Sequence, residues 1–391
     1  MSSASDSARH WLAEIFKLPA PAQPFHLLNV CGGHERSITQ AGLRSVLPEW
    51  LKLVPGPGCP VCVCPEEDIA LAIAIAVHHP VTLLAFGDLL RVPVNPRRFR
   101  GHGPTPLIPV RIRSLAEAKA AGADIRPIAS PLDALAIAQQ QQKPVVFFAA
   151  GFETTMAPMA ALIGQYLRQG LPDNLGFLIS GRRTWPAVAQ LLNDDKSLTI
   201  DGLIAPGHVA TVMGMEEWRF VVSDHQLPAA VAGFDSDSLL QAFYRVLVQT
   251  QTGTPALENC YPQAVTLNGN TRARQQLDEC FLVNEANWRG IGVLPASGYQ
   301  LRSNFDAVNA RVRYGQLCDE IQACGRDRDL PNSCQCADVV MARCLPHECR
   351  LYGHTCTPQQ PVGPCMVSDE GACRIWWSAG VTQLHLHEVH P

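Results

Sequence analysis

A thiol, an imidazole and a carboxylate stand within five positions, at Cys31, His34 and Glu35, directly after an apolar stretch of strand length. Gly32 and Gly33 follow the thiol, and glycines there let the backbone turn tightly and a ligand approach closely. We therefore expect Cys31 to be presented to a ligand rather than buried. His34 could take up the thiol proton and Glu35 could orient the imidazole, which would make a metal-binding or nucleophilic set. The structural alternative is a strand-end cysteine beside a hydrogen-bonded histidine.

A second thiol motif, Gly-Pro-Gly-Cys59-Pro-Val-Cys62-Val-Cys64-Pro65, precedes an acidic and then apolar segment of helical composition. Pro65 suits a first helical turn, and thiolates are stabilised just ahead of a helix N-terminus. A C-x-x-C pair in that place is typical of dithiol/disulfide exchange. Zinc is less favoured, because no second C-x-x-C completes four ligands. Cys59 and Cys62 are therefore candidate redox residues, against a structural alternative.

Two further motifs follow apolar stretches. In Gly-Phe-Glu153-Thr154-Thr155 the carboxylate should lie at the carboxyl end of a strand. Ligands collect there in parallel sheets, so Glu153 could accept or relay a proton. Thr154 or Thr155 could instead simply cap the next helix. His208, in Pro-Gly-His-Val, could add an imidazole to the same cleft, although a single histidine is more often structural.

Seven of the 15 cysteines fall in one stretch near the C-terminus that is rich in Pro and Gly. Packing gives no reason for such crowding, so the stretch indicates a metal or cluster domain. Iron–sulfur clusters take four Cys thiolates, and zinc with four Cys is the competing interpretation. The absence of paired C-x-x-C knuckles favours iron–sulfur. The seven are Cys334, Cys336, Cys344, Cys349, Cys356, Cys365 and Cys373.

Composition limits the class of protein. The first seven residues have neither the basic nor the apolar region of a secretory signal, so we expect a cytoplasmic protein with reduced thiols. The longest apolar run, residues 69–77, is shorter than the ~20 residues of a membrane span, so no membrane association is expected. The formal charge of −4 and the lack of a basic stripe argue against nucleic acid as a partner.

Short apolar runs alternate with helical patterns over the first two thirds of the chain. The runs are near-continuous, as expected of parallel strands buried on both faces. They lie at residues 26–30, 81–86, 145–150, 175–180, 202–205 and 229–233, with Ala-rich helical segments at 66–77, 115–121, 132–142 and 156–168. This order predicts an α/β fold with two Rossmann-like lobes facing each other across a cleft.

The βα rhythm ends before the cysteine-rich stretch, which predicts a third, irregular domain. We expect residues 25–120 with 229–265 to form a first lobe that carries Cys31 and the Cys59/Cys62 motif. Residues 121–228 should form a second lobe with Glu153. Residues 1–24 with 266–391 should form the third, iron–sulfur domain.

Five motifs stand in order along the chain: Cys-Gly-Gly-His-Glu, Gly-Pro-Gly-Cys-Pro-Val-Cys, Gly-Phe-Glu-Thr-Thr, Pro-Gly-His-Val and Pro-Val-Gly-Pro-Cys-Met-Val-Ser-Asp-Glu-Gly-Ala-Cys. Taken together, they resemble the HypD family of hydrogenase maturation proteins. Each motif alone is modest, but five in order are specific, and the similarity spans essentially the whole chain. The resemblance implies two α/β lobes and a third domain with a [4Fe–4S] cluster. It also implies work with a HypC-type small chaperone and a HypE-type cyanide donor in building the Fe(CN)2CO unit of [NiFe]-hydrogenase.

Carried over by the resemblance, Cys31 is the ligand of the iron under assembly, supported by His34 and Glu35, and Cys59 and Cys62 are the redox pair. The family spacing C-x12-C-x6-C-x16-C places the cluster on Cys336, Cys349, Cys356 and Cys373. Cys334, Cys344 and Cys365 then lie outside it, although Cys365 could replace one ligand. We add Glu153 as a catalytic candidate. The candidate residues for binding the CN- and CO-carrying iron are Gly32, Gly33, Thr154, Thr155 and His208.

Two other functions stay open from the sequence. The first is an iron–sulfur-dependent thiol/disulfide electron-transfer reductase, which needs Cys59 and Cys62 but not Cys31. The second is a non-enzymatic two-lobed binding protein with a zinc-stabilised tail. No standard turnover reaction can be assigned from the sequence.

Overall fold

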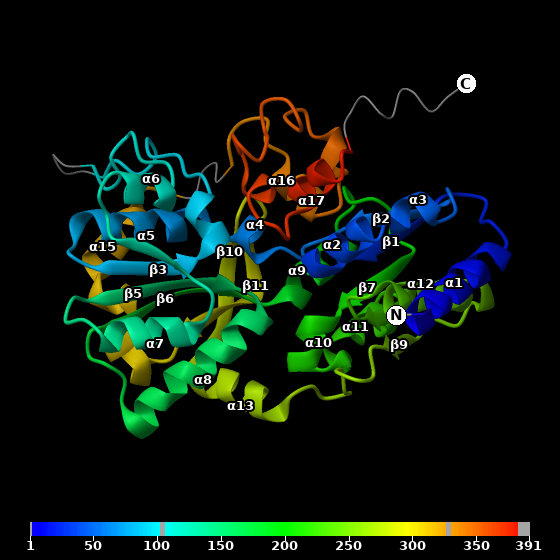
Figure 1. Ribbon diagram of the computed structural model, residues 1–391, viewed down its shortest axis with the longest axis horizontal. Coiled ribbons are helices and arrows are strands. Elements are labelled where there is room, and N and C mark those ends of the chain that lie inside the picture. The colour runs from blue at the N-terminus through cyan, green and yellow to red at the C-terminus, as the bar shows by residue number, and fades with distance from the viewer. Residues whose placement is uncertain (1, 102–105, 326–329, 382–391) are drawn as a thin grey trace.

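The computed structural model describes residues 2–101, 106–325 and 330–381, and contains two sheets with a cysteine-rich region beside their junction (Figure 1). The expected α/β class with parallel strands is confirmed. None of the helices in the described ranges has the length and apolar character needed to span a bilayer.

The first lobe is built on a five-stranded parallel sheet of order β2-β1-β7-β8-β9. The strands at residues 202–206 and 229–232 are buried on both faces, which is typical of parallel strands covered by helices on each side. α1 (Ser2–Lys17) and α12 (Ser236–Thr252) cover one face, where Ile15, Phe25 and Phe243 share a core. The strands are β1 (Phe25–Asn29), β2 (Leu51–Pro55), β7 (Gly202–Pro206), β8 (Ala229–Ala232) and β9 (Leu257–Cys260).

The second lobe is built on a six-stranded sheet of order β10-β11-β6-β5-β3-β4, in which an antiparallel hairpin extends four parallel strands. Alternate residues of β5 face opposite cores, since Val146 packs with α5 and Phe147 with α8. The strands are β3 (Thr82–Phe86), β4 (Ile125–Ile128), β5 (Val145–Gly151), β6 (Leu175–Arg182), β10 (Phe281–Trp288) and β11 (Gly292–Leu301).

Helices follow most strands. Those of the first lobe are α1 (Ser2–Lys17), α2 (Gly32–Gln40), α3 (Leu43–Val46), α4 (Pro60–Val63), α10 (Gly207–Met213), η2 (Met215–Trp218), α11 (Phe220–Ser223) and α12 (Ser236–Thr252). Those around the second sheet are α5 (Glu66–His78), η1 (Gly87–Arg91), α6 (Leu115–Ala120), α7 (Pro131–Gln139), α8 (Glu153–Gln169), α9 (Thr184–Leu192), α13 (Thr271–Cys280), η3 (Ser303–Val308), α14 (Ala310–Arg313) and α15 (Gly315–Ala323).

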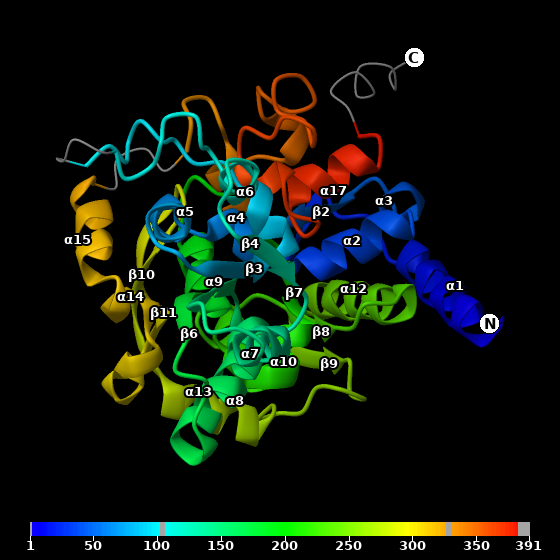
Figure 2. The ribbon, with the colours of Figure 1, turned by 60° about the vertical axis from the view of Figure 1, so that its left-hand side comes forward.

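The cysteine-rich region is a chain of turns and short helices, in keeping with its many turn residues. It contacts α2 and α4, and the orange and red segments lie beside those helices in both views (Figures 1 and 2). Its elements are α16 (Cys336–Val340), η4 (Pro346–Glu348), η5 (Pro364–Met366) and α17 (Ala372–Ser378).

Sheet membership differs from the lobe boundaries that the sequence suggested. β3, expected in the first lobe, pairs with β4 and β5 in the second sheet, and β7 pairs with β1 and β8 in the first. α1 packs on α12 rather than on the cysteine-rich region, and β10 and β11 extend the second sheet. An apolar run identifies a buried strand but not its neighbours, because any parallel crossover can lead to either sheet. Residues 1, 102–105, 326–329 and 382–391 of the expected division lie outside the described residues.

The placement of α1 can be tested with two adjacent substitutions. Ile15 is fully buried in the first-lobe core, whereas Phe16 is 60% exposed. Ile15→Ala should lower the free energy of unfolding by about 2–5 kcal/mol, because it removes buried methylene groups and leaves a cavity. Phe16→Ala is the control and should change it little. Urea denaturation followed by circular dichroism measures both, and equal midpoints would contradict this packing.

Candidate functional site

Cys31 lies where β1 passes into α2, as the residue that precedes the first helical turn. The loop after β2 reaches the same point, because β1 and β2 are parallel neighbours whose carboxyl ends share one edge. The N–H of Gly32 donates to the carbonyl of Gly58 at 3.1 Å. A Cβ on Gly58 would stand 2.6 Å from Cys31 Cα, so this close approach of two loops requires glycine.

Cys31 and Cys59 line one small cavity, together with residues of the cysteine-rich region. Its free space is about 10 Å³. One wall comes from the ends of β1 and β2, and the other comes from Val339, Val340, Cys365, Glu370 and Ala372. The structure therefore brings the two expected thiol motifs together and adds Cys365, whose position the sequence left open.

The Cys31 thiol is only partly exposed, so the expected presentation to a ligand is limited in this conformation. Burial raises the pKa of Cys31 to about 12, and the nearby carboxylates of Glu370 and Glu35 act in the same direction. Backbone N–H groups of His34 and Gly33 donate to the sulfur and partly oppose the rise in pKa. Cys31 is therefore a neutral thiol at pH 7, and a metal must displace its proton to bind.

His34 is fully buried, with Nδ1 3.2 Å from the side-chain oxygen of Asn29 and Nε2 3.0 Å from the carbonyl of Ala232. Burial lowers the pKa of His34 to about 3, while the Ala232 carbonyl partly opposes this shift. An imidazole with so low a pKa is a weak base toward the Cys31 thiol. The geometry supports a role for the His34 backbone N–H at the sulfur instead.

Glu35 contacts neither nitrogen of His34 in the described hydrogen bonds. Its carboxylate accepts from Arg44 at 2.7 Å, from Asn29 at 3.2 Å and from the Trp376 indole N–H at 2.5 Å. Asn29 thus stands between Glu35 and His34, and Glu35 also ties α2 to α17. Arg44 lies over the Trp376 ring, 4.8 Å from its centroid.

Cys59 and Cys62 form a disulfide at the start of α4. The N–H of Cys62 donates to Cys59 Sγ at 3.2 Å, and both residues are buried. Cys64 points to the second lobe, where its sulfur lies 3.6 Å from Ser180 Oγ. The close approach of Cys59 and Cys62 suits a redox pair, and that role stays a prediction.

Six of the seven C-terminal thiols converge. Cys334 lies near Cys336, Cys336 near Cys365, and Cys365 near Cys373, since each thiol acts on the pKa of the next, and the N–H of Cys373 donates to Cys365 Sγ at 3.4 Å. Cys349 and Cys356 are close enough to Cys373 to raise its pKa. Within the described ranges, no group of three or more His, Cys, Asp or Glu side chains is already arranged to hold a metal ion.

Glu153 lies apart from the Cys31 cavity, at the junction of the two lobes. It is fully buried and accepts from both the backbone N–H and the hydroxyl of Thr184 at 2.7 Å. Burial raises its pKa, which these two donors partly oppose. Glu217, from the first lobe, is paired with Arg183 at 3.3 Å. Burial and then Glu153 raise the pKa of Glu217 to about 7.

The other expected cleft residues are also separate from the cavity. Thr154 and Thr155 lie in the first turn of α8, and Thr155 packs so closely on Gly151 that a Cβ there would stand 2.2 Å away. His208 is stacked on Phe234 with ring centroids 3.7 Å apart, and burial lowers its pKa. His208 also lowers the pKa of His34, whose ring centroid lies 4.7 Å from that of Phe234. A binding role for these three residues stays a prediction.

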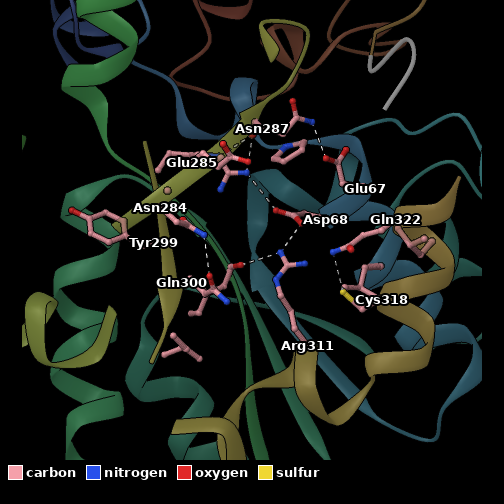
Figure 3. Close-up of a pocket in the computed structure, with 18 of the residues that line it drawn as sticks. Glu67, Asp68, Asn284, Glu285, Asn287, Tyr299, Gln300, Arg311, Cys318 and Gln322 are labelled. Carbon is pink, nitrogen blue, oxygen red and sulfur yellow. Dashed lines mark hydrogen bonds and ion pairs between the residues drawn. The ribbon is translucent and has the colours of Figure 1, made fainter. Parts of the chain in front are cut away.

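A larger cavity of about 370 Å³ lies between α5, the β10–β11 hairpin and α15 (Figure 3). Asp68 accepts from Arg311 and from Ser180, both at 2.5 Å. Ser180 in turn contacts Cys64. Asp68 also lies 3.6 Å from Arg182, and none of the residues that line this cavity lines the Cys31 cavity.

Sequence reasoning did not select Asn29, Asp88, Glu217 or Glu370. Glu370 lies within the C-terminal motif and Asn29 within the apolar run before Cys31, while Asp88 follows a buried strand, which is a signal for a site residue in parallel sheets. Glu217 carried no such signal, because its neighbours come from the other lobe.

The raised pKa of Glu217 gives a pH test of the lobe junction. A carboxyl whose folded pKa is about 7 binds its proton more tightly in the folded state. The free energy of unfolding should therefore fall as the pH rises from about 5 to 8. Glu217→Gln removes this titrating group, so the loss of unfolding free energy with rising pH should be smaller, by on the order of 2 kcal/mol at pH 8. Glu216→Gln, at an exposed neighbour whose pKa is lowered by Arg219, is the control and should leave the slope unchanged.

Comparison with known proteins supplies the family. The family model HypD, described as "Hydrogenase formation hypA family", matches residues 6–380. Hydrogenase maturation factor HypD of Rhizobium leguminosarum bv. viciae is 36% identical over 386 residues, which cover 97% of this chain and 93% of that protein. The protein of the same name from Escherichia coli (strain K12) is 37% identical over 361 residues, 91% and 89% of the two chains. That of Rhodobacter capsulatus is 36% identical over 380 residues, 95% of each. The chain belongs to the HypD family of hydrogenase maturation factors.

Proposed function

We propose that this protein holds an iron atom through Cys31 while cyanide and carbonyl ligands are added, as the assembly scaffold for the Fe(CN)2CO unit of [NiFe]-hydrogenase. The observation that carries the proposal is the shared cavity of Cys31 and Cys59, closed by a cysteine-rich wall. A HypC-type chaperone and a HypE-type cyanide donor are the proposed partners, in the cytoplasm. Family membership supports maturation in general, and the cavity supports this particular role.

Cys31 offers the iron cargo one soft sulfur ligand, and thiolate suits iron that carries strong-field ligands. The thiol proton must leave when iron binds. The N–H groups of Gly33 and His34 then stabilise the thiolate, as donors to sulfur at a helix N-terminus do. The His34 ring, held by Asn29 and Ala232, keeps this turn in place.

Cys59 and Cys62 are the proposed electron store beside the iron. Oxidation of the dithiol to the disulfide releases two electrons and two protons, and reduction takes them up again. Cys59 lines the cavity with Cys31, so this exchange would occur next to the cargo.

The C-terminal thiols fit a [4Fe–4S] cluster in chemistry, and binding would draw them together from their present positions. Thiolates are the usual ligands, and all four expected ones are buried in one core. Gly363 leaves room for sulfur, because a Cβ there would stand 2.5 Å from the sulfurs of both Cys334 and Cys336. When bound, the cluster would supply one-electron transfer next to the cavity. Cys336, Cys349, Cys356 and Cys373 would hold it by the expected spacing.

Cys334 is an alternative fourth ligand to Cys336. Cys334 acts on the pKa of Cys356 together with Cys349, and Cys336 acts on the pKa of Cys373 together with Cys349 and Cys356, so either thiol could complete the set. Cys365 lies between the cluster thiols and the Cys59 cavity. This chain of thiols favours, as a second candidate function, a reductase that passes electrons to Cys59 and Cys62 without iron assembly.

Cys31→Ala separates the two functions. The scaffold function predicts that the variant keeps its fold and its cluster iron but loses the cyanide and carbonyl infrared bands of the complex with its small partner. Infrared spectroscopy of the anaerobically purified complex measures this. If the cyanide and carbonyl bands both persist in Cys31→Ala, the iron is held by other residues.

Cluster binding predicts unequal effects among neighbouring cysteines. Cys349→Ala should remove most of the bound iron and sulfide and loosen the last domain, since cluster binding and folding are coupled. Cys344→Ala, outside the expected ligands, is the matched control and should retain them. Iron analysis and visible absorption measure the difference.

A second pair of variants identifies the fourth ligand. Of Cys334→Ala and Cys336→Ala, the variant that loses the cluster has lost that ligand.

A further inference from the structure

The cavity beside Cys31 is too small for the cargo that the proposed function assigns to it. Its free space of about 10 Å³ is room for about one water molecule. An iron atom with cyanide and carbonyl ligands needs several times that volume. If Cys31 is the iron ligand, one wall of the cavity must therefore move.

The wall formed by the first lobe is fixed. β1 and β2 are joined along their length, and the loops beyond them are tied by two further backbone bonds. The N–H of Gly32 donates to Gly58 at 3.1 Å, and the N–H of Gly56 donates to Asn29 at 2.9 Å. Moving this wall would break the sheet edge.

The opposite wall includes residues 364–372, here named the cover segment. In the described part of the chain, the backbone–backbone hydrogen bonds of residues 364–371 stay within the cysteine-rich region, and no such bond joins them to either lobe. Glu370 packs directly over the turn after Cys31, since a Cβ on Gly32 would stand 2.5 Å from Glu370 Cβ. The cover segment can thus leave without breaking a sheet.

The Ser368 side chain links the cover segment to the second lobe, in addition to the apolar packing of Met366 and Ala372 in a core that also holds second-lobe residues. Ser368 is fully buried, and its hydroxyl donates to Asp88 Oδ2 at 3.1 Å. The same hydroxyl accepts from the backbone N–H of Glu370 at 3.2 Å, so Asp88 is linked through Ser368 to the residue above Cys31. Asp88 itself follows β3, on the second sheet.

We propose that the cover segment is a movable lid over Cys31, latched by the Ser368–Asp88 hydrogen bond, and that the iron cargo reaches Cys31 only after this latch opens. The closed lid places Cys365 at the cavity with Cys59, and the open lid removes it. Thiol exchange with the cysteine-rich region and loading of iron are then separate states of one site.

Alkylation of Cys31 tests the lid without iron or a partner. The purified protein, Ser368→Ala, Asp88→Ala and the double variant are treated with iodoacetamide at one pH, and the Cys31 peptide is quantified by mass spectrometry. Each single variant should raise the rate of Cys31 alkylation about five-fold, because it removes one hydrogen bond that keeps the cover segment closed. The double variant should react no faster than either single, because both remove the same contact.

Ser378→Ala is the control, because the exposed Ser378 hydroxyl donates to the Arg374 carbonyl within α17. This substitution should leave the rate of Cys31 alkylation unchanged. Unaltered rates in both Ser368→Ala and Asp88→Ala would overturn the proposal, as would full additivity in the double variant. Asp88→Ala lies outside the cysteine-rich region, so it tests the latch even if Ser368→Ala folds poorly. The infrared test of Cys31 succeeds or fails independently of these rates.

Discussion

The parallel pairing of β1 with β2 is the constraint on which the candidate site depends. The register Asn29↔Pro55 aligns the carboxyl ends of the two strands, so the loops that carry Cys31 and Cys59 begin at the same edge. Gly58 then lets the loops touch through their backbones. A shift of one residue would turn these strands inside out and separate the thiols. The remaining features of the site act on thiols that this register has already brought together.

Burial sets the chemistry of these thiols. Removal from water favours the neutral form of a group, and it raises the pKa of Cys31 while it lowers that of His34. The site therefore carries little charge in the closed state. A soft metal that replaces the thiol proton binds a buried sulfur, and water competes poorly for the metal there. This suits a scaffold that binds an iron carrying small, strongly bonded ligands and later releases it.

The cysteine-rich region joins the two lobes as well as carrying thiols. Trp376 reaches Glu35 in the first lobe, and Ser368 reaches Asp88 in the second. The lobes meet again at Glu153 and Glu217, where burial raises the pKa of both carboxyls and Glu153 further raises that of Glu217. Apolar packing also joins the three parts, since Met366 and Trp376 share a core with α5 and Met341 shares a core with Leu28 of β1. A lid over Cys31 would have to release Met366 from its core.

The sequence by itself determined the α/β class, the thiol motifs and their positions at strand ends. These follow from local pattern, because continuous apolar runs need burial on both faces and glycines mark close approaches. Only the tertiary structure decided that β3 and β7 change sheets, that Glu153 lies away from Cys31, and that Cys365 borders the cavity. Each of these is a long-range neighbour relation, and apolar runs do not encode which partner they meet. The pKa values of Cys31 and His34 depended on the same relation, since burial is a property of the surroundings and not of the residue.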